Sequence, residues 1–438
     1  MRVNLIDVLI SLFCLMKTEI RSMRFSFFMC LSVCLHLHSQ NQALGFKHFT
    51  ISDGISNSYI TDILQDKRGY IWIGTTDGLN RFDGYDFKVY KKNPFDKTTI
   101  GGNYIRCLYE DSRGNIWVGL LNGIVSKFDP KVEKFTNYSC ILKESKVLGD
   151  GDISGIVEDK DGLFWIAVDR KGFVRFNPDT GNFSCYESTP NNTNSLSHNA
   201  TTSIAIGRDN CIWITTWGGG LNRFDPRKKK FTHYMDSVGV SDGVLCKHLR
   251  CQYHDRYGNV WVGTDHGGLY CVNIDTKEWK QYTHTSGNVK GLSHETVSDI
   301  IEDANGGMWV ATLGGGVCIW DRKKTEFRYV VAGKGASSLL TNSVNCLYRD
   351  SAGTIWLGTR NGVHFYNSLM IKFNKYDVKD WDEQSEDGYI FSILKNKAGR
   401  ILVKGRNKLI SFDERTNEVA FLDIVKPQYE KVRKLVMF

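Results

Sequence analysis

Residues 69–84 read GYIWIGTTDGLNRFDG, and close copies follow at 115–129 (NIWVGLLNGIVSKFD) and 260–275 (VWVGTDHGGLYCVNID). Each copy holds a run of apolar residues around a tryptophan, then a small residue, then a turn that contains glycine. The tryptophan recurs seven times at intervals of 45 to 48 residues, at Trp72, Trp117, Trp165, Trp213, Trp261, Trp309 and Trp356. A fixed period of about 40–50 residues is the signature of a propeller or a solenoid.

The repeat has an internal order that predicts four short strands. Asp stands six positions before the tryptophan in six of the seven copies, and Gly or Asn stands three positions before it in all seven. Asp side chains bond the backbone amides of turns, and Gly or Asn accepts positive φ, so this spacing predicts a tight hairpin turn. A fourth run carries an aromatic pair such as Phe87 and Tyr90. No 3.6-residue period is sustained, so the sequence predicts an all-β fold of four-stranded propeller blades.

The register of the repeats predicts a closed, seven-bladed β-propeller. Residues 46–49 (FKHF) look like a fourth strand with no first three before it, so they can complete the blade at 344–366 and remove an open edge. The predicted division is therefore 1–39 for an N-terminal extension and signal peptide, 40–366 for the propeller, and 367–438 for the start of a second, truncated propeller. Closure with a later blade, beyond this chain, is the alternative.

The beginning of the chain predicts export. From Met23 the sequence reads MRFSFFMCLSVCLHLHSQ, which has a basic start, an apolar stretch and the small residue Ser39 before a polar segment. This order is typical of a secretory signal peptide and is too short for a membrane span. We expect a mature chain that begins near Gln40, with no later segment apolar enough to cross a membrane.

Charge and cysteine usage point away from several function classes. The net charge is +8, but the basic residues are scattered through every repeat, so nucleic acid is not expected as a partner. Cys107, Cys251 and Cys346 each stand ten residues before the tryptophan, where other repeats carry Gly155 or Ser203. This pattern predicts a small packing slot with structural thiols. No Cys/His ligand spacing is present, so neither a metal nor a cofactor is expected.

Catalytic motifs are absent from the sequence. It contains no nucleophile elbow, no H-E-x-x-H and no P-loop, and its GGG strings at 218–220 and 314–316 lie in β-turns instead of between a strand and a helix. Most acidic residues repeat with the blades, which makes them turn formers. We expect no catalytic residues. A propeller enzyme of the lyase or quinoprotein type stays an alternative, because a fold does not decide a function.

The turns between the second and third strands carry the candidate ligand-binding residues. Residue types differ there from one repeat to the next, as expected for a surface tuned to a ligand around the central opening. The candidates are Trp217, His266, Arg360, Asp77 and Arg170. Aromatic faces stack on sugar rings and polar groups bond hydroxyls, so a small molecule, and in particular an oligosaccharide, is the expected ligand. The alternative for most of these residues is a solvated turn.

The repeats resemble the two-component regulator propeller repeat. The closest matches are SDGISNSYITDILQDKRGYIWIGTTDGLNRFDGYDFKVY at 52–90 and LTNSVNCLYRDSAGTIWLGTRNGVHFYN at 340–367, and the resemblance extends over about 45–425. In that family the repeats form the exported sensor region of hybrid histidine kinases, in which two propellers precede a β-sandwich, one membrane span and the kinase domains. Many members respond to oligosaccharides.

The resemblance implies a periplasmic sensor region and not an enzyme. The expected partners are the ligand and the missing C-terminal propeller, sandwich and kinase domains of a parent protein anchored in the inner membrane, and a homodimer is left open. No kinase motif occurs in this chain. An exported protein-interaction scaffold is the alternative function.

Overall fold

The computed structural model forms two compact units, Met1–Ser368 and Leu369–Phe438, which we describe separately. No helix in the part of the chain described below is long and apolar enough to cross a membrane. The predicted signal peptide at 1–39 lies outside the described residues. The structure describes residues 45–138, 151–234, 248–276, 278–284, 291–323, 325–333, 338–367, 392–396, 400–404, 408–412 and 419–423.

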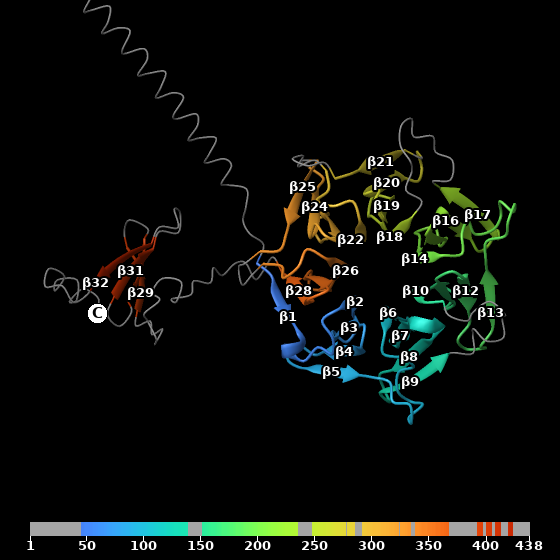
Figure 1. Ribbon diagram of the computed structural model, residues 1–438, viewed down its shortest axis with the longest axis horizontal. Helices are drawn as coiled ribbons and strands as arrows, with labels where there is room; N and C mark the ends of the chain where they lie inside the picture. Colours follow the sequence, from blue (N-terminus) through green and yellow to red (C-terminus); the bar gives the residue numbers. More distant parts are fainter. Residues whose placement is uncertain are drawn as a thin grey trace, which may run out of the picture. The chain divides into compact units, whose positions relative to one another are not determined.

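The first unit is a ring of seven four-stranded antiparallel sheets (Figure 1). The innermost strands are β2 (Ile60–Gln65), β6 (Ile105–Glu110), β10 (Ile153–Glu158), β14 (Thr201–Ile206), β18 (Leu249–His254), β22 (Val297–Glu302) and β26 (Val344–Arg349). The second strands, which carry the repeated tryptophans, are β3 (Ile71–Thr75), β7 (Ile116–Leu120), β11 (Phe164–Val168), β15 (Ile212–Thr216), β19 (Asn259–Thr264), β23 (Met308–Thr312) and β27 (Ile355–Thr359).

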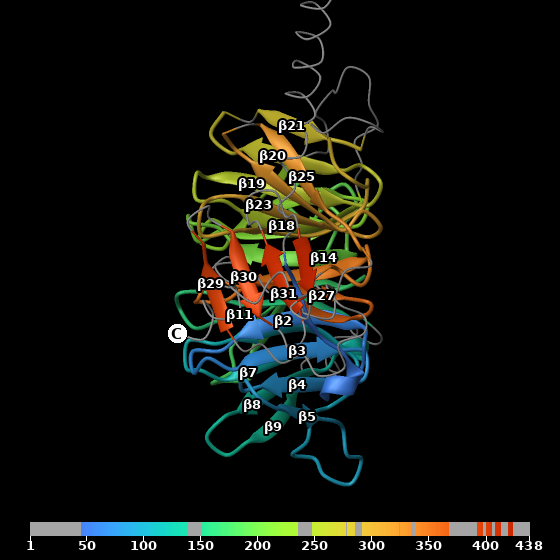
Figure 2. The same cartoon turned by 90° about the vertical axis from the view of Figure 1, so that its left-hand side faces the viewer.

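The two outer strands complete each blade. The third strands are β4 (Gly78–Phe82), β8 (Val125–Asp129), β12 (Gly172–Phe176), β16 (Gly220–Asp225), β20 (Leu269–Asn273), β24 (Val317–Asp321) and β28 (Gly362–Tyr366). The outermost strands are β5 (Phe87–Tyr90), β9 (Lys134–Tyr138), β13 (Phe183–Tyr186), β17 (Lys230–Tyr234), β21 (Trp279–Tyr282), β25 (Glu326–Val330) and β1 (Lys47–Phe49). Figure 2 shows the four strands of the first blade, β2 to β5, in this order. The predicted all-β propeller fold is confirmed.

The ring closes through the N-terminal strand. β1 pairs antiparallel with β28, with Lys47 opposite Phe365 and Phe49 opposite Val363. The innermost strands contact one another in sequence, and β26 contacts β2. The ring of Phe49 lies 4.9 Å from that of Phe82 in the next blade, measured between centroids. The prediction that residues 46–49 complete the blade at 344–366 is therefore confirmed.

In six of the seven blades an aspartate connects the turn to the blade core. Asp66 Oδ1 accepts hydrogen bonds from the amides of Arg68 and Tyr70, both at 3.0 Å, while Oδ2 accepts one from Trp72 Nε1 at 2.9 Å. Gly69, in the same turn, has φ +94°. The predicted Asp turn is thus correct. The sequence argument missed the Asp–Trp bond, which recurs in five more blades, at Trp117, Trp165, Trp261, Trp309 and Trp356.

The small residue after each tryptophan is required where neighbouring blades meet. A Cβ at Gly119 would lie 2.6 Å from Ile153 Cγ2 on the innermost strand of the next blade. Trp117 also packs across this boundary, with its ring centroid 4.3 Å from that of Phe164. Apolar clusters of this kind join consecutive blades, and they account for the repeated Ile-Trp-Ile cores.

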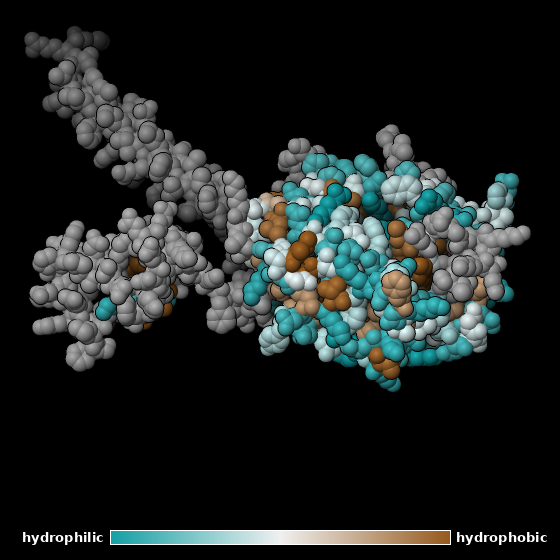
Figure 3. Space-filling model, turned by 60° about the horizontal axis from the view of Figure 1, so that its bottom comes forward, coloured by the Kyte–Doolittle hydropathy of each residue, from teal (hydrophilic) through white to brown (hydrophobic). Residues whose placement is uncertain are grey.

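Apolar residues on the outer surface are dispersed. Figure 3 shows one side of the molecule as mostly hydrophilic, with brown residues in small groups. Two large side chains between strands, Tyr85 and Phe95, are 92% and 98% exposed. Single exposed apolar residues are normal for a soluble surface and mark no docking patch by themselves.

The second unit contains one described four-stranded sheet. Its strands are β29 (Ser392–Lys395), β30 (Ile401–Lys404), β31 (Lys408–Phe412) and β32 (Val419–Asp423), paired in that order. A single sheet of this topology agrees with one blade. The second propeller predicted from residue 367 onward stays a prediction.

Candidate ligand-binding site in the central channel

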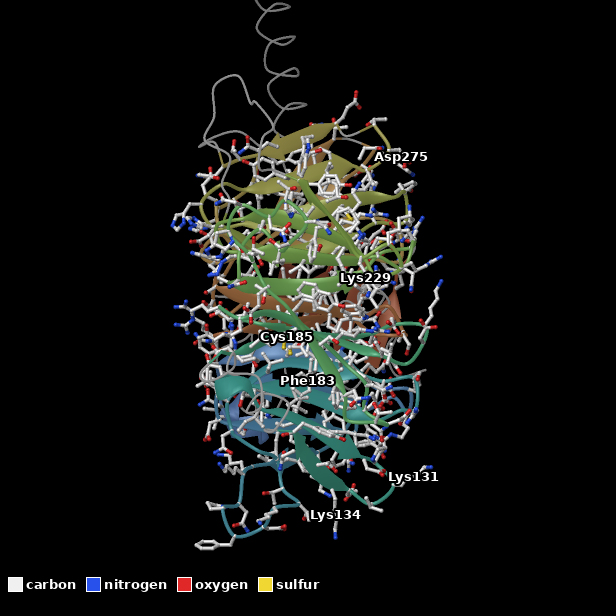
Figure 4. The ribbon with its side chains drawn as sticks, turned by 90° about the vertical axis from the view of Figure 1, so that its right-hand side faces the viewer. Lys131, Lys134, Phe183, Cys185, Lys229 and Asp275 are labelled. Atoms are coloured by element: carbon white, nitrogen blue, oxygen red, sulfur yellow. The ribbon has the colours of Figure 1, made fainter. Side chains whose placement is uncertain are left out.

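The turns between second and third strands share one end of the propeller with the links that enter the next blade. The amides of Gly78, Gly172 and Gly362 donate to the carbonyls of Asn103, Asn199 and Ser58 at 2.7, 2.9 and 2.8 Å. The sequence argument assumed this arrangement, and these bonds confirm it. The turns between third and fourth strands lie at the opposite end of their strands. Figure 4 labels Lys131, Lys229 and Asp275 on three such turns and Lys134 at the start of β9.

A cavity of about 830 Å³ lies along the central channel. Its size is within the ~300–1,000 Å³ that small-molecule sites occupy. Two consecutive repeat positions on the innermost strands line it in all seven blades. The position eleven residues before the tryptophan holds Thr61, Arg106, Ser154, Thr202, Arg250, Ser298 and Asn345, and the position ten before it holds Asp62, Cys107, Gly155, Ser203, Cys251, Asp299 and Cys346.

A β-bulge explains why two consecutive residues line the channel. Pairing of the first two strands shifts register between Ile60 and Asp62, and it shifts at the same place in each of the other blades. A bulge inserts one extra residue and re-aims the side chains beside it. Strict alternation along a strand would predict only one of the two positions, so the sequence argument missed this wall.

The cysteine position is therefore more than a small packing slot. Cys107, Cys251 and Cys346 are buried, and burial raises the pKa of each thiol, so these residues stay protonated, as expected for structural thiols. The same position also holds Asp62 and Asp299, which the size argument did not consider. The interpretation based on Gly, Ser and Cys alone was incomplete.

Two aspartates in the cavity wall, Asp62 and Asp299, join neighbouring blades. Asp62 Oδ1 accepts from the amide of Ile63 at 2.8 Å, and Oδ2 accepts from Leu108 in the next blade at 2.7 Å. Asp299 makes the equivalent bond to Leu347 at 2.7 Å. Burial raises the pKa of Asp62 to about 7 and that of Asp299 to about 6. Both carboxyls therefore titrate near neutral pH in the cavity wall.

The structure brings together some of the five predicted site residues. Trp217 and Arg170 line the cavity. The guanidinium of Arg360 lies 5.8 Å from the ring centroid of Tyr59, which also lines it. Asp77 is not among the lining residues; Lys91 Nζ lies 2.6 Å from its carboxylate.

His266 also lies outside the lining. Its side chain is 79% exposed, and Nδ1 lies 3.0 Å from Asp265 Oδ2. The five candidates do not occupy one repeat position, because Trp217 and Arg360 stand four residues after the blade tryptophan and the other three stand five after it. The register alone does not decide which of them line the cavity, because Arg170 lines it from the later position and Arg360 does not line it from the earlier one.

An aromatic and cationic group forms one side of the channel mouth. Trp217 is 36% exposed and stacks on His248 with a centroid distance of 4.9 Å and an interplanar angle of 27°. Arg250 lies over the Trp217 ring at 5.7 Å, and its Nε is 3.4 Å from Asp265 Oδ1. Sequence reasoning found Trp217 but not His248 or Arg250, because His248 lies on the link before β18, Arg250 lies on β18, and neither belongs to the turn.

Two further Arg–Asp pairs lie on the other side of Trp217. Arg106 Nε is 3.7 Å from Asp152 Oδ2, and Arg170 Nε is 3.3 Å from Asp169 Oδ2. An ordered guanidinium donates hydrogen bonds and a carboxylate accepts them, so such pairs can bond the hydroxyl groups of a polar ligand. In the described residues, no group of three His, Cys, Asp or Glu side chains could hold a metal ion.

Comparison with known proteins identifies the repeats. A family model described as two component regulator propeller matches residues 54–77, 99–122, 291–314 and 338–361. Histidine kinase P4 from Formosa agariphila is 52% identical over 68 residues, which are 16% of this chain and 5% of that protein.

Several solved structures share the fold. The extracellular domain of BT3049, a proposed hybrid two component system from B. thetaiotaomicron, matches with a TM-score of 0.63 and 21% identity over 87% of this chain and 55% of that chain. The corresponding domain of BT4673 gives 0.61 and 20% over 88% and 48%. The chain thus spans about half the length of these two structures. A streptogramin B lyase gives 0.56 and 17% over 74% and 97%.

At these identities the solved structures establish a common fold, and the sequence matches establish the repeats. The matched segments contain Asp62, Arg106 and Asp299 of the cavity lining, whereas Arg170, Trp217 and Arg250 lie outside them. Four segments of this chain are accordingly similar to the two-component regulator propeller repeat.

Proposed function

We propose that this chain is the extracytoplasmic, periplasmic ligand-sensing part of a two-component signal transduction sensor, and that it recognises an oligosaccharide. The repeats, the local identity to a histidine kinase and the fold shared with extracellular domains of hybrid two-component systems support a sensor-type propeller. The kinase that would transmit the signal belongs, in this proposal, to a longer parent protein.

One observation carries the ligand assignment. The sevenfold repetition of the blades is broken at the channel mouth, where Trp217 presents a partly exposed ring between Arg–Asp pairs. Blade cores repeat because they must pack, whereas this surface has no packing reason to hold an exposed indole. An aromatic face flanked by polar groups suits a sugar, which has apolar C–H faces and hydroxyl edges.

Signalling would require a difference in affinity between two arrangements of the sensor. A ligand that binds both arrangements equally shifts no equilibrium, however tightly it binds. The bonds from Asp62 and Asp299 to the next blade lie in the cavity wall, so a ligand in the channel can contact groups that hold blades together.

A binding panel tests the proposal. The purified chain is screened against defined oligosaccharides, and each ligand that binds is titrated against Trp217→Ala. We expect at least about a tenfold loss of affinity, because removal of a central aromatic anchor costs on the order of 1.4–2 kcal/mol or more. Tyr85→Ala, which removes an exposed aromatic ring from the turn between β4 and β5, is the matched control and should bind normally.

Two results would contradict this function. If no oligosaccharide in the panel binds, an oligosaccharide is excluded as the ligand, and the protein-interaction scaffold becomes the favoured function. Cleavage of a bound oligosaccharide, followed by chromatography of the products, would favour the enzyme alternative. We expect the ligand to be recovered intact.

A further inference from the structure

The charges around the channel mouth are paired. Three arginines line the cavity, and each has a carboxylate oxygen within 3.7 Å of its Nε: Asp152 for Arg106, Asp169 for Arg170 and Asp265 for Arg250. The side chains of Arg106 and Arg250 are 38% and 31% exposed, whereas that of Arg170 is 71% exposed. Two of the three pairs are thus partly shielded from solvent, and the third is open to it.

The deeper wall adds carboxyls without cations. Asp62 and Asp299 face the channel, and their oxygens bond backbone amides instead of a guanidinium. The raised pKa values of Asp62 and Asp299 leave these two carboxyls incompletely ionised near neutral pH, so the repulsion of an anionic group comes mainly from the three paired carboxylates. Like charges placed close together repel, which disfavours a uronate or a sulfate.

Uncharged hydroxyl groups are not repelled by these carboxyls and can form hydrogen bonds with the Arg–Asp pairs. One hydroxyl can donate to a carboxylate and accept from the neighbouring guanidinium, so it can bridge an Arg–Asp pair without disturbing its neutrality. Ser154, Ser298 and Asn345 in the same wall are uncharged; each donates a bond to a backbone carbonyl of the next blade, and its side-chain oxygen can still accept a hydrogen bond from a hydroxyl. The Trp217 ring supplies an apolar face.

We propose that the channel selects uncharged oligosaccharides and rejects acidic ones, because its lining arginines are already neutralised by Asp152, Asp169 and Asp265. This inference rests on the proposed function and deepens it. Arg360 differs from these three arginines. It lies beside the lining residue Tyr59, and no carboxylate pairs with it among the described residues, so its effect on acidic ligands is tested separately.

The first experiment compares ligands that differ only in charge. Oligogalacturonate and chondroitin hexasaccharides are tested before and after reduction of their carboxyl groups to alcohols, together with neutral hexasaccharides of glucose, mannose and xylose. We expect the preferred ligand to be neutral. Any acidic member that binds should gain at least about tenfold in affinity after reduction, the factor that corresponds to about 1.4 kcal/mol.

Charge-neutral variants then test the cause. Asp169→Asn and Asp265→Asn release Arg170 and Arg250, so each should narrow the preference for the reduced ligand by about threefold or more, since the anion then meets an unpaired guanidinium. Asp179→Asn breaks an exposed ion pair with Arg113 outside the cavity and is the matched control, expected to change nothing.

The outcomes separate the two proposals. No binding by any ligand would overturn the proposed function and this inference with it. Binding of an acidic hexasaccharide that weakens on reduction would overturn the inference alone. If that binding is then lost in Arg360→Gln, the unpaired guanidinium of Arg360 is the group that binds the acidic ligand. An unchanged preference in both aspartate variants would also overturn the stated cause.

Discussion

Removal of the carboxylate of Asp111, in the second blade, should measure how much the hydrogen bonds of this turn, including the Asp–Trp bond, stabilise the propeller. Asp111 is 3% exposed and accepts four hydrogen bonds, from the amides of Arg113 and Asn115, from Asn115 Nδ2 and from Trp117 Nε1, at 2.8 to 3.0 Å. Asp111→Ala removes all four acceptor contacts at once.

The expected cost follows from the donors left behind. Trp117 is fully buried, and Asn115 is 9% exposed, so their N–H groups cannot turn to water. Each buried donor without a partner costs about 1–3 kcal/mol, so we expect Asp111→Ala to lower the free energy of unfolding by about 2–6 kcal/mol. Asp111→Asn keeps one oxygen and presents a donor to the indole, so its cost should be intermediate.

The natural control lies in the fourth blade, where Gly207 stands in place of the aspartate. Trp117→Phe loses an indole–carboxylate bond and leaves Asp111 Oδ2 with the bond from Asn115 Nδ2 alone, whereas Trp213→Phe loses no such bond, although both rings are buried to within 2% exposure. The first substitution should therefore be more costly by about 1–3 kcal/mol. Both are measured by equilibrium denaturation in urea with the slope compared between variants.

Equal costs for the two tryptophan substitutions would refute this reasoning. So would a double-mutant cycle between Asp111→Ala and Trp117→Phe whose coupling energy is near zero, because the two groups would then act independently.

Three other predictions concern stability. His364 is fully buried, and burial, with a smaller contribution from His48, lowers its pKa to about 4, whereas a histidine in the unfolded chain titrates near 6.5. The free energy of unfolding should therefore fall by up to about 3 kcal/mol as the pH drops from about 6.5 to 4. His364→Gln should reduce this dependence on pH, measured by denaturation at a series of pH values. Gly172→Ala should lower the free energy of unfolding by about 2–5 kcal/mol, because φ is +77° and the new Cβ would collide with the carbonyl oxygen of Tyr186. Gly181→Ala is the control: its φ is +73° but no atom lies near the new Cβ, so the loss should be only about 1–2 kcal/mol. Similar melting temperatures of the two variants would contradict the collision. Phe49→Ala should lower the free energy of unfolding by about 2–4 kcal/mol. It should also increase the rate of amide hydrogen exchange more in β28, which pairs with β1, than in β16 of another blade. An equal increase in both strands would contradict a local opening at the closing blade.

The blade architecture was accessible to sequence reasoning because it depends on residues that must repeat. The tryptophan, the turn Asp and the turn glycines recur with the strands that they stabilise, so spacing alone identified strands, turns and the closing role of residues 46–49. The bond between Asp66 and Trp72 was missed because six residues of separation along a hairpin give no contact until its register is known.

The channel was less accessible for a physical reason. The bulge after Ile60 rotates two successive residues toward the same side, so neither strand alternation nor turn position indicates that Asp62 and Arg250 face one cavity. The signal was present in the variety of residue types eleven positions before each tryptophan, which has no place in a repeated packing core.

The pairing of β1 with β28 also imposes an order on the assembly of the propeller. Phe49 and its partner Val363 are separated by 314 residues, so at roughly 5–20 residues per second the ribosome finishes the second roughly 16–60 seconds after the first. Each intervening blade can form from strands that are adjacent in the chain, whereas β1 must wait as a lone strand and then bring together ends whose closure costs about 5 kcal/mol of chain entropy. The first segment of the propeller to be synthesised is thus the last to be fixed, and whatever keeps it from pairing elsewhere in that interval decides whether the ring forms at all.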